Sequence, residues 1–302
     1  MMREELTSQE AYTFLRDVLE VDTPERKMKD DPTGLLQEIV SLWHQHIPFQ
    51  TITSIATPHE QRHVPTIDDI KRTIFTKVGG CCYENNVGCY LILHALGFKV
   101  VLVASDIGWE NNHVIPVVEN LTCQGSRHIV DVGTGGYPTL IPIALDFKKT
   151  SPEYHHSYLR YKFVVDCDII RRLHDVDSDP AGAARFPDFV VDGWYPYIII
   201  HHCTAVDLSF FKEPMNKIYT QVLPSPPFLS SPRSTAFPNC RLLSIKDTTL
   251  LREDDEGNVI KTYLKSPDDV IAAYARFFPQ IPKEMVEAAL NDVNVKLDFN
   301  KE

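Results

Sequence analysis

The sequence predicts an α+β fold, and three observations predict it. Through most of the first 97 residues, apolar side chains recur at helical spacing. After Gly97 the pattern changes to short β-branched runs separated by loops, which is typical of strands. The C-terminal third mixes strand-like and helix-like segments. Because helices and strands are grouped rather than alternating regularly, an α+β arrangement is favoured over repeated βαβ units.

Four helices are expected in the N-terminal region, and each has a start or stop signal. These signals are Ser8 before the first helix, Pro48 after the second, Thr66 before the third and Gly97 after the fourth. The fourth helix begins near Cys81 or Cys82, directly after two glycines. A loop is expected over residues 22–33, because this stretch is charged and holds two prolines.

Short strands dominate the prediction beyond Gly97. They are expected over residues 98–104, 113–118, 128–132, 158–166, 196–201, 241–245 and 259–263. Residues 174–189 are expected to form a surface loop or insertion, and the stretch 222–238, rich in proline and serine, an irregular connection. Two helices complete the prediction, over residues 266–277 behind a capping Ser266 and over 283–290.

Composition narrows the class of function. The chain has 302 residues, and 30 Lys and Arg against 41 Asp and Glu give a net charge of −11. This balance disfavours a nucleic-acid partner, because phosphate contacts need Lys and Arg. No apolar run approaches the roughly 20 residues that span a bilayer, and the N-terminal residues lack an apolar signal core, so we expect no membrane association and a cytoplasmic location. The seven cysteines, two of them adjacent, fit poorly with a disulfide framework.

The densest unusual stretch is Gly79-Gly80-Cys81-Cys82-Tyr83-Glu84-Asn85-Asn86. Its two glycines allow a sharp turn and close backbone approach, and a Cys then stands at a predicted helix start. Free N–H groups and the helix dipole stabilise a thiolate there, which is a far better nucleophile than a thiol. The alternative is a small buried Cys beside a turn, since free Cys is commonly buried and inert.

Two residues further along have the types that would activate such a thiol. His113 opens an apolar strand after a polar loop, a position from which an imidazole can act as a general base. Asp131 ends another apolar strand, where a carboxylate is costly to bury unless paired, for example with an imidazole. Cys82, His113 and Asp131 thus have the types of a nucleophile, a base and an orienting group. The alternatives are an ordinary core or surface His and a turn Asp.

The segments around these residues resemble the arylamine N-acetyltransferase family. Residues 79–86 match its Arg-Gly-Gly-x-Cys-x-Glu-x-Asn motif after the first position, and this match makes Cys82, not Cys81, the nucleophile. Four further segments are similar to family segments. They are residues 46–50 (family Ile/Val-Pro-Phe-Glu-Asn), the strand from His113 (the catalytic His strand), residues 129–135 (Val-Asp-Val-Gly-Phe-Gly) and residues 219–228 (the acetyl-CoA cleft).

The resemblance implies three regions around a cysteine-protease-like triad. They are a helical bundle carrying the Cys (residues 1–97), a central β-barrel carrying His and Asp with an insertion near 174–189 (residues 98–205), and a C-terminal α/β lid (residues 206–302).

It also implies a ping-pong transfer without a metal. Acetyl-CoA acylates Cys82, and the acetyl group passes to a small-molecule arylamine, arylhydroxylamine or hydrazine. His113 serves as base and then acid, Asp131 holds His113, and backbone N–H groups near Cys82 stabilise the oxyanion. Tyr219 and Ser225 carry over as CoA contacts.

The chain departs from the family pattern at two positions near the motifs. Val78 stands where the family has Arg, which removes a charge and up to five donors, and the neighbouring Lys77 is a candidate substitute. Thr134 replaces a Phe that lies near the acceptor pocket in the family, so the sequence leaves the identity of the acceptor undetermined.

Three other classes of function compete with the transferase. A thiol hydrolase, either a protease or an amidase, uses the same triad, and only the fate of the thioester separates the two. A non-catalytic binding protein on the same scaffold would fit the changes at Val78 and Thr134. A metal site is disfavoured because the adjacent Cys81 and Cys82 lack the two-residue spacing of zinc ligands.

Overall fold

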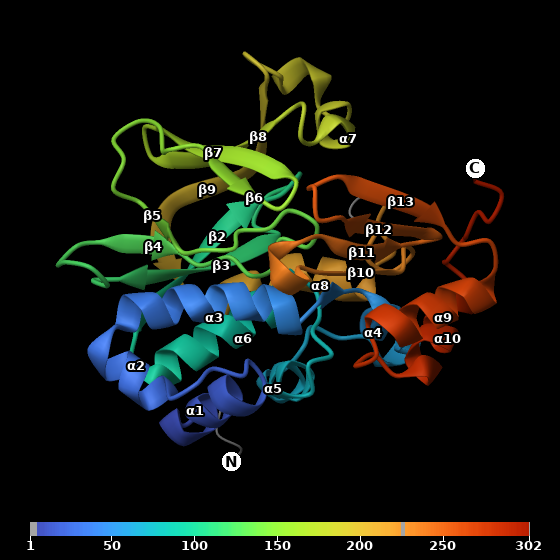
Figure 1. Cartoon of the computed structure of the whole chain (residues 1–302), viewed down its shortest axis with the longest axis horizontal. Coiled ribbons are helices and arrows are strands. Elements are labelled where there is room, and N and C mark those ends of the chain that lie inside the picture. The colour runs from blue at the N-terminus through green and yellow to red at the C-terminus, as the bar shows by residue number, and fades with distance from the viewer. Residues whose placement is uncertain (1–4, 225–226, 302) are drawn as a thin grey trace.

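The structure, a computed structural model, describes residues 5–224 and 227–301. Figure 1 shows two sheets with helices packed against each of them. The larger sheet has the strand order β5-β4-β3-β2-β9-β8-β7-β6, and the smaller has the order β1-β10-β11-β12-β13. The predicted α+β fold is therefore confirmed, with N-terminal helices, a curled central sheet and a C-terminal mixture of strands and helices.

The N-terminal helices form one layer below the larger sheet in Figure 1. They are α1 (Ser8–Asp17), α2 (Pro24–Asp30), α3 (Pro32–His46), α5 (Ile67–Phe75) and α6 (Cys82–Leu96). Helix α6 is the central one, and most of its residues are buried on every side. Because a helix that is apolar all round lies inside a protein, α6 carries its first residue, Cys82, into the interior.

Two local expectations in this layer were wrong. Thr7, not Ser8, caps α1: its hydroxyl accepts from the Glu10 N–H, and the Glu10 carboxylate accepts from the Thr7 N–H in return. The expected loop over residues 22–33 holds α2 and the start of α3, which begin at Pro24 and Pro32. Proline is tolerated at the first helical position, because its missing N–H would have no partner there.

The larger sheet is antiparallel throughout and curls into a half-barrel. Its strands are β2 (Lys99–Asp106), β3 (His113–Glu119), β4 (Arg127–Ile129), β5 (Ile143–Ala144), β6 (Tyr154–His156), β7 (Leu159–Asp166), β8 (Ile169–Asp175) and β9 (Trp194–Val206). Helix α6 lies against β2 and β3. The expected insertion at 174–189 lies mostly between β8 and β9 and carries the short helix α7 (Pro180–Ala183).

The smaller sheet, which we call the lid sheet, joins distant segments. It contains β1 (Phe49–Gln50), β10 (Arg233–Ala236), β11 (Leu243–Lys246), β12 (Thr249–Glu253) and β13 (Val259–Tyr263). Helices α4 (Ile52–Ala56), α9 (Pro267–Phe277) and α10 (Lys283–Leu290) form an apolar core with it, while α8 (Lys212–Thr220) packs in the core of the N-terminal helices. The irregular stretch expected at 222–238 in fact contains β10, and β12 was not predicted.

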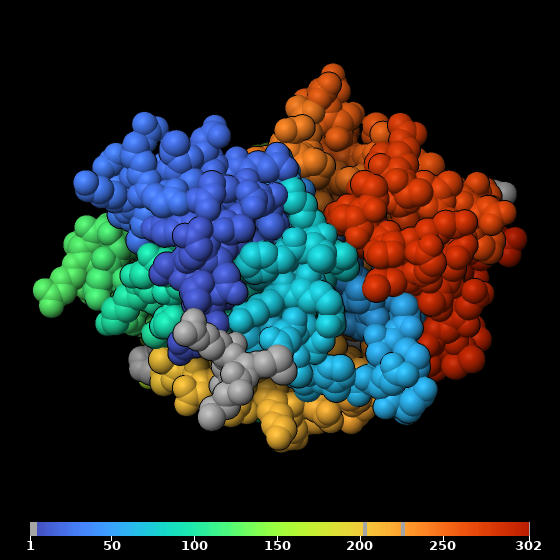
Figure 2. Space-filling model, turned by 90° about the horizontal axis from the view of Figure 1, so that it is seen from below, coloured from blue at the N-terminus to red at the C-terminus, as the bar shows by residue number. Residues whose placement is uncertain are grey.

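The lid sheet brings residues from the N-terminal region to the C-terminal region. Phe49 pairs with Thr235 and Gln50 with Ser234, so β1 is the edge strand beside β10. In Figure 2, seen from below, the surface around residues 50–60 (light blue) adjoins the C-terminal region (red). None of the helices within residues 5–224 and 227–301 has the length and apolarity needed to cross a bilayer.

Candidate active site

The turn before α6 explains how Cys82 reaches the interior. Gly79 has a φ of +69°, and a Cβ at this position would overlap the carbonyl oxygen of Pro48, so only glycine fits. Cys81 is the N-cap of α6 but makes no side-chain cap. The Glu84 carboxylate instead accepts from the backbone N–H groups of Cys81 and Glu84. Cys82 then begins the helix with 4% of its surface exposed.

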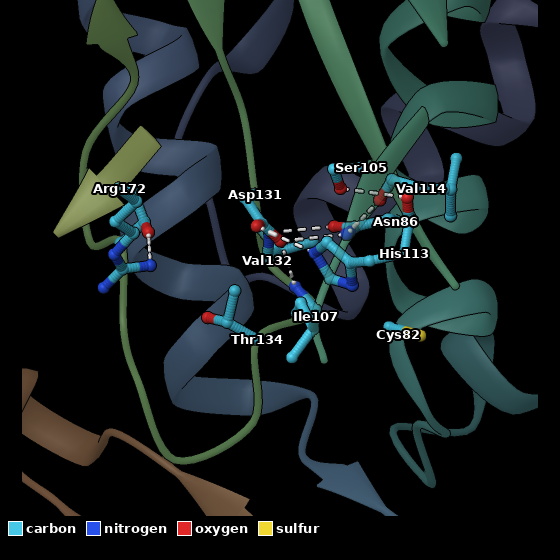
Figure 3. Close-up of polar contacts among 12 residues, drawn as sticks. Cys82, Asn86, Ser105, Ile107, His113, Val114, Asp131, Val132, Thr134 and Arg172 are labelled. Carbon is cyan, nitrogen blue, oxygen red and sulfur yellow. Dashed lines mark hydrogen bonds and ion pairs between the residues drawn. The ribbon is translucent and has the colours of Figure 1, made fainter. Parts of the chain in front are cut away.

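His113 and Asp131 form a buried ion pair beside Cys82. The imidazole Nε2 lies 2.9 Å from the Asp131 Oδ2, and the two side chains are 1% and 2% exposed. Since Nε2 is taken by Asp131, the side-chain hydrogen bond between His113 and Cys82 uses Nδ1. In Figure 3 the His113 ring lies between Asp131 and Cys82. The three residues singled out in the sequence are therefore brought together from α6, β3 and the segment after β4.

The charges of this pair follow from its surroundings. Burial lowers the pKa of His113, but attraction and hydrogen bonding from Asp131, together with Cys82, outweigh burial and raise the pKa to about 10. Burial likewise raises the pKa of Asp131, but His113, Asn86 and the Gly133 N–H together hold that pKa below its usual value. At neutral pH the site therefore contains an imidazolium paired with a carboxylate, and this cation lies beside the Cys82 sulfur.

Asn86 is a support of Asp131 that the sequence reasoning did not single out. Its Nδ2 donates to the Asp131 Oδ1 at 2.9 Å and to the Val114 carbonyl at 2.7 Å, and its Oδ1 accepts from the Val132 N–H at 2.9 Å. A Cβ at Gly133 would lie 2.8 Å from the Asn86 Nδ2, so glycine permits this close approach. The signal available in the sequence was spacing. Asn86 follows Cys82 by four residues, and residues four apart on a helix share a face.

The two adjacent cysteines have different environments. The Cys81 thiol is fully buried, and its Sγ donates to the Gln50 carbonyl at 3.4 Å. Burial, followed by repulsion from Glu84, raises the pKa of Cys81 well above its ordinary value. The Cys82 Sγ lies 3.9 Å from the Asn112 carbonyl oxygen and beside the imidazolium. Cys81 therefore stays a thiol, whereas the Cys82 sulfur is the one that lies beside the imidazolium of His113.

The residues carried over as CoA contacts lie outside the triad. Tyr219 is 4% exposed, and its hydroxyl donates to the Glu84 carboxylate. Burial raises the pKa of Glu84 to about 7, although the Tyr219 hydrogen bond opposes this rise. The contact links the end of α8, where the segment 219–228 begins, to the start of α6. Ser225 lies outside the described residues.

The two departures from the motifs have clear environments. Val78 is 9% exposed and adds no polar group to the site. Lys77 does not take over the missing Arg, because its Nζ binds the Glu20 carboxylate at 2.9 Å. The Thr134 hydroxyl donates to the Tyr137 carbonyl and stabilises the loop after Asp131.

A buried cation on the half-barrel, Arg172, binds the loop after Asp131. Arg172 is 1% exposed and donates to the Thr139 hydroxyl at 2.9 Å and to the Pro138 carbonyl at 3.0 Å. Its guanidinium carbon lies 4.0 Å from the centre of the Tyr161 ring. In Figure 3 Thr134 lies between Arg172 and Cys82, so the loop forms one wall of the site. Among the described residues, no group of His, Cys, Asp and Glu side chains is arranged to hold a metal.

Known proteins match this chain both in sequence and in fold. An N-acetyltransferase family model matches residues 34–173, which include all three triad residues. The arylamine N-acetyltransferase of Mycolicibacterium smegmatis is 28% identical over 138 residues, 41% of this chain and 48% of that protein. The arylamine N-acetyltransferase of Mycobacterium bovis is 27% identical over 138 residues, 42% of this chain and 48% of that protein. The chain thus spans about half the length of the curated relatives it matches.

Two solved structures share the fold over nearly the whole chain. The Mycobacterium marinum arylamine N-acetyltransferase in complex with CoA has a TM-score of 0.72 at 17% identity, covering 93% of this chain and 98% of that one. The Salmonella typhimurium arylamine N-acetyltransferase has a TM-score of 0.72 at 12% identity, covering 95% and 98%. The chain therefore has the fold of these arylamine N-acetyltransferases. The arylamine N-acetyltransferase fold extends beyond the matched sequence segment to the lid sheet and α9 and α10.

Proposed function

We propose that this chain is an acetyl-CoA-dependent N-acetyltransferase that works through a thioester on Cys82. The observation that carries the proposal is the arrangement of three side chains: a helix-start Cys82 beside an imidazolium, with Asp131 2.9 Å behind it. A thiolate, an imidazole and an orienting carboxylate are the groups that acyl transfer through a thiol needs. The family resemblance supports the choice of acetyl-CoA as donor, since the M. marinum relative binds CoA.

The first half-reaction acylates the enzyme. The Cys82 thiolate attacks the acyl carbon of acetyl-CoA and forms a tetrahedral intermediate with a negatively charged oxygen. The carbon–sulfur bond to CoA then breaks, and the CoA sulfur takes the proton of the His113 Nδ1. Asp131 remains ionised and keeps the imidazole oriented. The products are an acetyl-Cys82 thioester, a neutral His113 and free CoA.

The second half-reaction returns the acetyl group to an acceptor. A neutral amine attacks the thioester carbon while His113 Nδ1 accepts a proton from the amine nitrogen. The bond to Cys82 breaks, and the thiolate and imidazolium are restored together with an N-acetylated product. The acceptor is an arylamine, an arylhydroxylamine or a hydrazine. Arylamines suit the mechanism because conjugation of the nitrogen lone pair with the ring leaves them largely unprotonated at neutral pH.

The start of α6 supplies electrostatic help for the tetrahedral intermediates. The backbone N–H groups of the first helical turn have no partners within the helix, and they carry the positive end of its dipole. Those of Cys81 and Glu84 already donate to the Glu84 carboxylate. The N–H groups of Cys82 and Tyr83 are therefore the ones we assign to the developing oxyanion, as donors worth about 10²-fold or more in rate.

The decisive experiment is intact-protein mass spectrometry after mixing with acetyl-CoA in the absence of an acceptor. The wild type is expected to gain one acetyl group. Cys82→Ala is expected to gain none, whereas the matched Cys81→Ala variant keeps the adduct because Cys81 is a protonated thiol packed on Gln50.

Two other results would contradict the proposed transferase. An adduct that disappears on standing without an acceptor would indicate a thiol hydrolase. Folded wild-type protein that gains no acyl group from acetyl-CoA or from longer acyl-CoAs would leave a binding protein on the same scaffold.

A further inference from the structure

The lid sheet has two faces of different character. Ala236, Ile245 and Leu250 lie on the face that packs with α9 and α10. Side chains alternate along a strand, so their neighbours Arg233 and Lys246 lie on the opposite face. These two cations are direct partners in the antiparallel register of β10 and β11. This second face is polar and basic, and it is directed away from the lid's own core.

The charges on the basic face are not neutralised by ion pairs. Within the described residues, no carboxylate lies within 4.0 Å of a nitrogen of Arg233 or Lys246, although like charges directly opposite each other destabilise a sheet. The Arg233 Nη2 is buried and has no hydrogen-bond partner. The nearby Asp247 attracts both cations, but its Oδ1 already accepts from Ser231 at 2.7 Å. This buried donor is available to an acceptor from outside the chain.

A third cation, Arg185, lies near enough to Arg233 and Lys246 to repel both of them. Arg185 follows α7 in the insertion between β8 and β9, and its side chain hydrogen-bonds the Tyr137 hydroxyl in the loop after Asp131. In Figure 1 α7 lies above the lid sheet, on the side away from α9 and α10. Burial lowers the pKa of Arg233 and of Lys246, and repulsion from Arg185 contributes to lowering both. Three cations from separate segments therefore converge in a chain of net charge −11.

Arg233 connects this cluster to the triad. Its guanidinium carbon lies 5.7 Å from the centre of the Phe228 ring, in the segment that resembles the acetyl-CoA cleft. It also attracts the Cys81 thiol electrostatically, and Cys81 directly precedes Cys82. Arg185 and Lys246 are exposed, so the cluster runs from the neighbourhood of Cys82 outward to solvent.

We propose that Arg185, Arg233 and Lys246 form an anion-binding subsite for a phosphate or carboxylate group of a substrate whose reacting atom lies at Cys82. The planar guanidinium of Arg233 offers paired donors to an oxyanion, and Lys246 and Arg185 add charge at the open end. The subsite itself stands on the geometry of the lid sheet. Only the assignment of the anion to an acyl donor or to an acceptor rests on the proposed function.

The first test measures binding of inorganic pyrophosphate by calorimetry. The Arg185→Gln/Lys246→Gln double variant removes two exposed charges and is expected to fold normally. We expect its Kd for pyrophosphate to rise by about tenfold, since the two exposed charges together contribute a factor of that order. The matched control is Arg252→Gln/Lys283→Gln, which removes the same charge from Arg252 on the other face of the lid sheet and Lys283 on α10.

The outcomes of this first test are distinct. A rise confined to the Arg185→Gln/Lys246→Gln variant supports the subsite. Equal rises in both double variants, or no binding to the wild type, overturn it, because the attraction would then be non-specific or absent. Arg233→Gln tests the deep end of the cluster in the same assay, with Arg233→Lys expected to recover part of the affinity.

A second test identifies the source of the anion. If the subsite takes a phosphate of the donor, the test variant raises KM for acetyl-CoA by about tenfold and leaves acetylation by S-acetyl-N-acetylcysteamine, which has no phosphate, unchanged. If it takes an acidic acceptor, transfer to 4-aminobenzoate falls while transfer to aniline is unchanged. Unchanged kinetics for all four substrates would contradict a substrate subsite. Failure of both thioesters to acylate the wild type would refute the proposed function alone, because the pyrophosphate titration is independent of it.

Discussion

The triad wall, by which we mean the His113–Asp131 pair and its support Asn86, and the basic face of the lid sheet both bury charge near the start of α6. They treat this charge differently. In the triad wall, Asp131 has His113 at 2.9 Å and Asn86 at 2.9 Å. On the lid face, Arg233 keeps a buried nitrogen without a partner and stands opposite Lys246. The triad wall is thus completed by folding alone. The charges of the lid face are instead neutralised when an anion binds. This difference explains why sequence motifs identify the triad wall and not the basic face.

Asp131→Asn should break the triad wall most severely. Asparagine keeps the shape but cannot stabilise the imidazolium or enforce the tautomer, so we expect the rate of Cys82 acetylation to fall by about 10⁴-fold. Rapid-quench mass spectrometry with acetyl-CoA measures this rate. Asp69→Asn alters a second His–Asp pair, with His63 at the surface, and should leave the rate unchanged. Similar losses in both variants would mean that the Asp131 pair has no special role.

Asp292→Ala should loosen the lid side without touching the triad. Asp292 pairs at 2.8 Å with Arg62, whose side chain is 2% exposed and also donates to carbonyls at Ile55 and Thr57. Its loss leaves a buried cation unpaired, so we expect the free energy of unfolding in urea to fall by about 3 kcal/mol. Asp255→Ala, which removes a surface partner of Arg241, should change little. Equal stabilities for the two variants would show that the Arg62 pair does not anchor the lid.

The pH dependence of stability should show the contribution of the His113–Asp131 pair, with a smaller effect than the two substitutions above. The pKa of His113 is raised from 6.5 to about 10, so its pairing stabilises the fold fully below pH 6.5 and is lost as the pH rises toward 10. Asp131 has a lowered pKa, so its contribution is present above its usual value of 3.8 and is lost in acid. Urea unfolding at pH 6 and pH 9.5 should show a larger decrease for wild type than for His113→Gln. The same decrease in both proteins would contradict a stabilising charged pair.

Local signals in the sequence predicted the elements that local chemistry controls. Ser266 caps α9, with Pro267 at its first position, and α10 spans the predicted residues 283–290. Cys82 at the start of α6 and His113 at the start of β3 were likewise placed from glycine, strand and motif signals. These features depend on neighbours within a few residues, which a sequence displays directly.

Other features were settled only by contacts between distant residues. Asn86 became the support of Asp131 because the segment after β4 passes over α6. Phe49 and Gln50 joined β10 across nearly two hundred residues, and Arg185 reached the basic face through an insertion whose contacts no local pattern encodes. The sequence alone placed Cys82 at the start of its helix and predicted the class of chemistry that we propose, because these follow from residue type and short-range geometry. Tertiary structure alone decided which charges are paired, since pairing depends on packing between segments far apart in the chain.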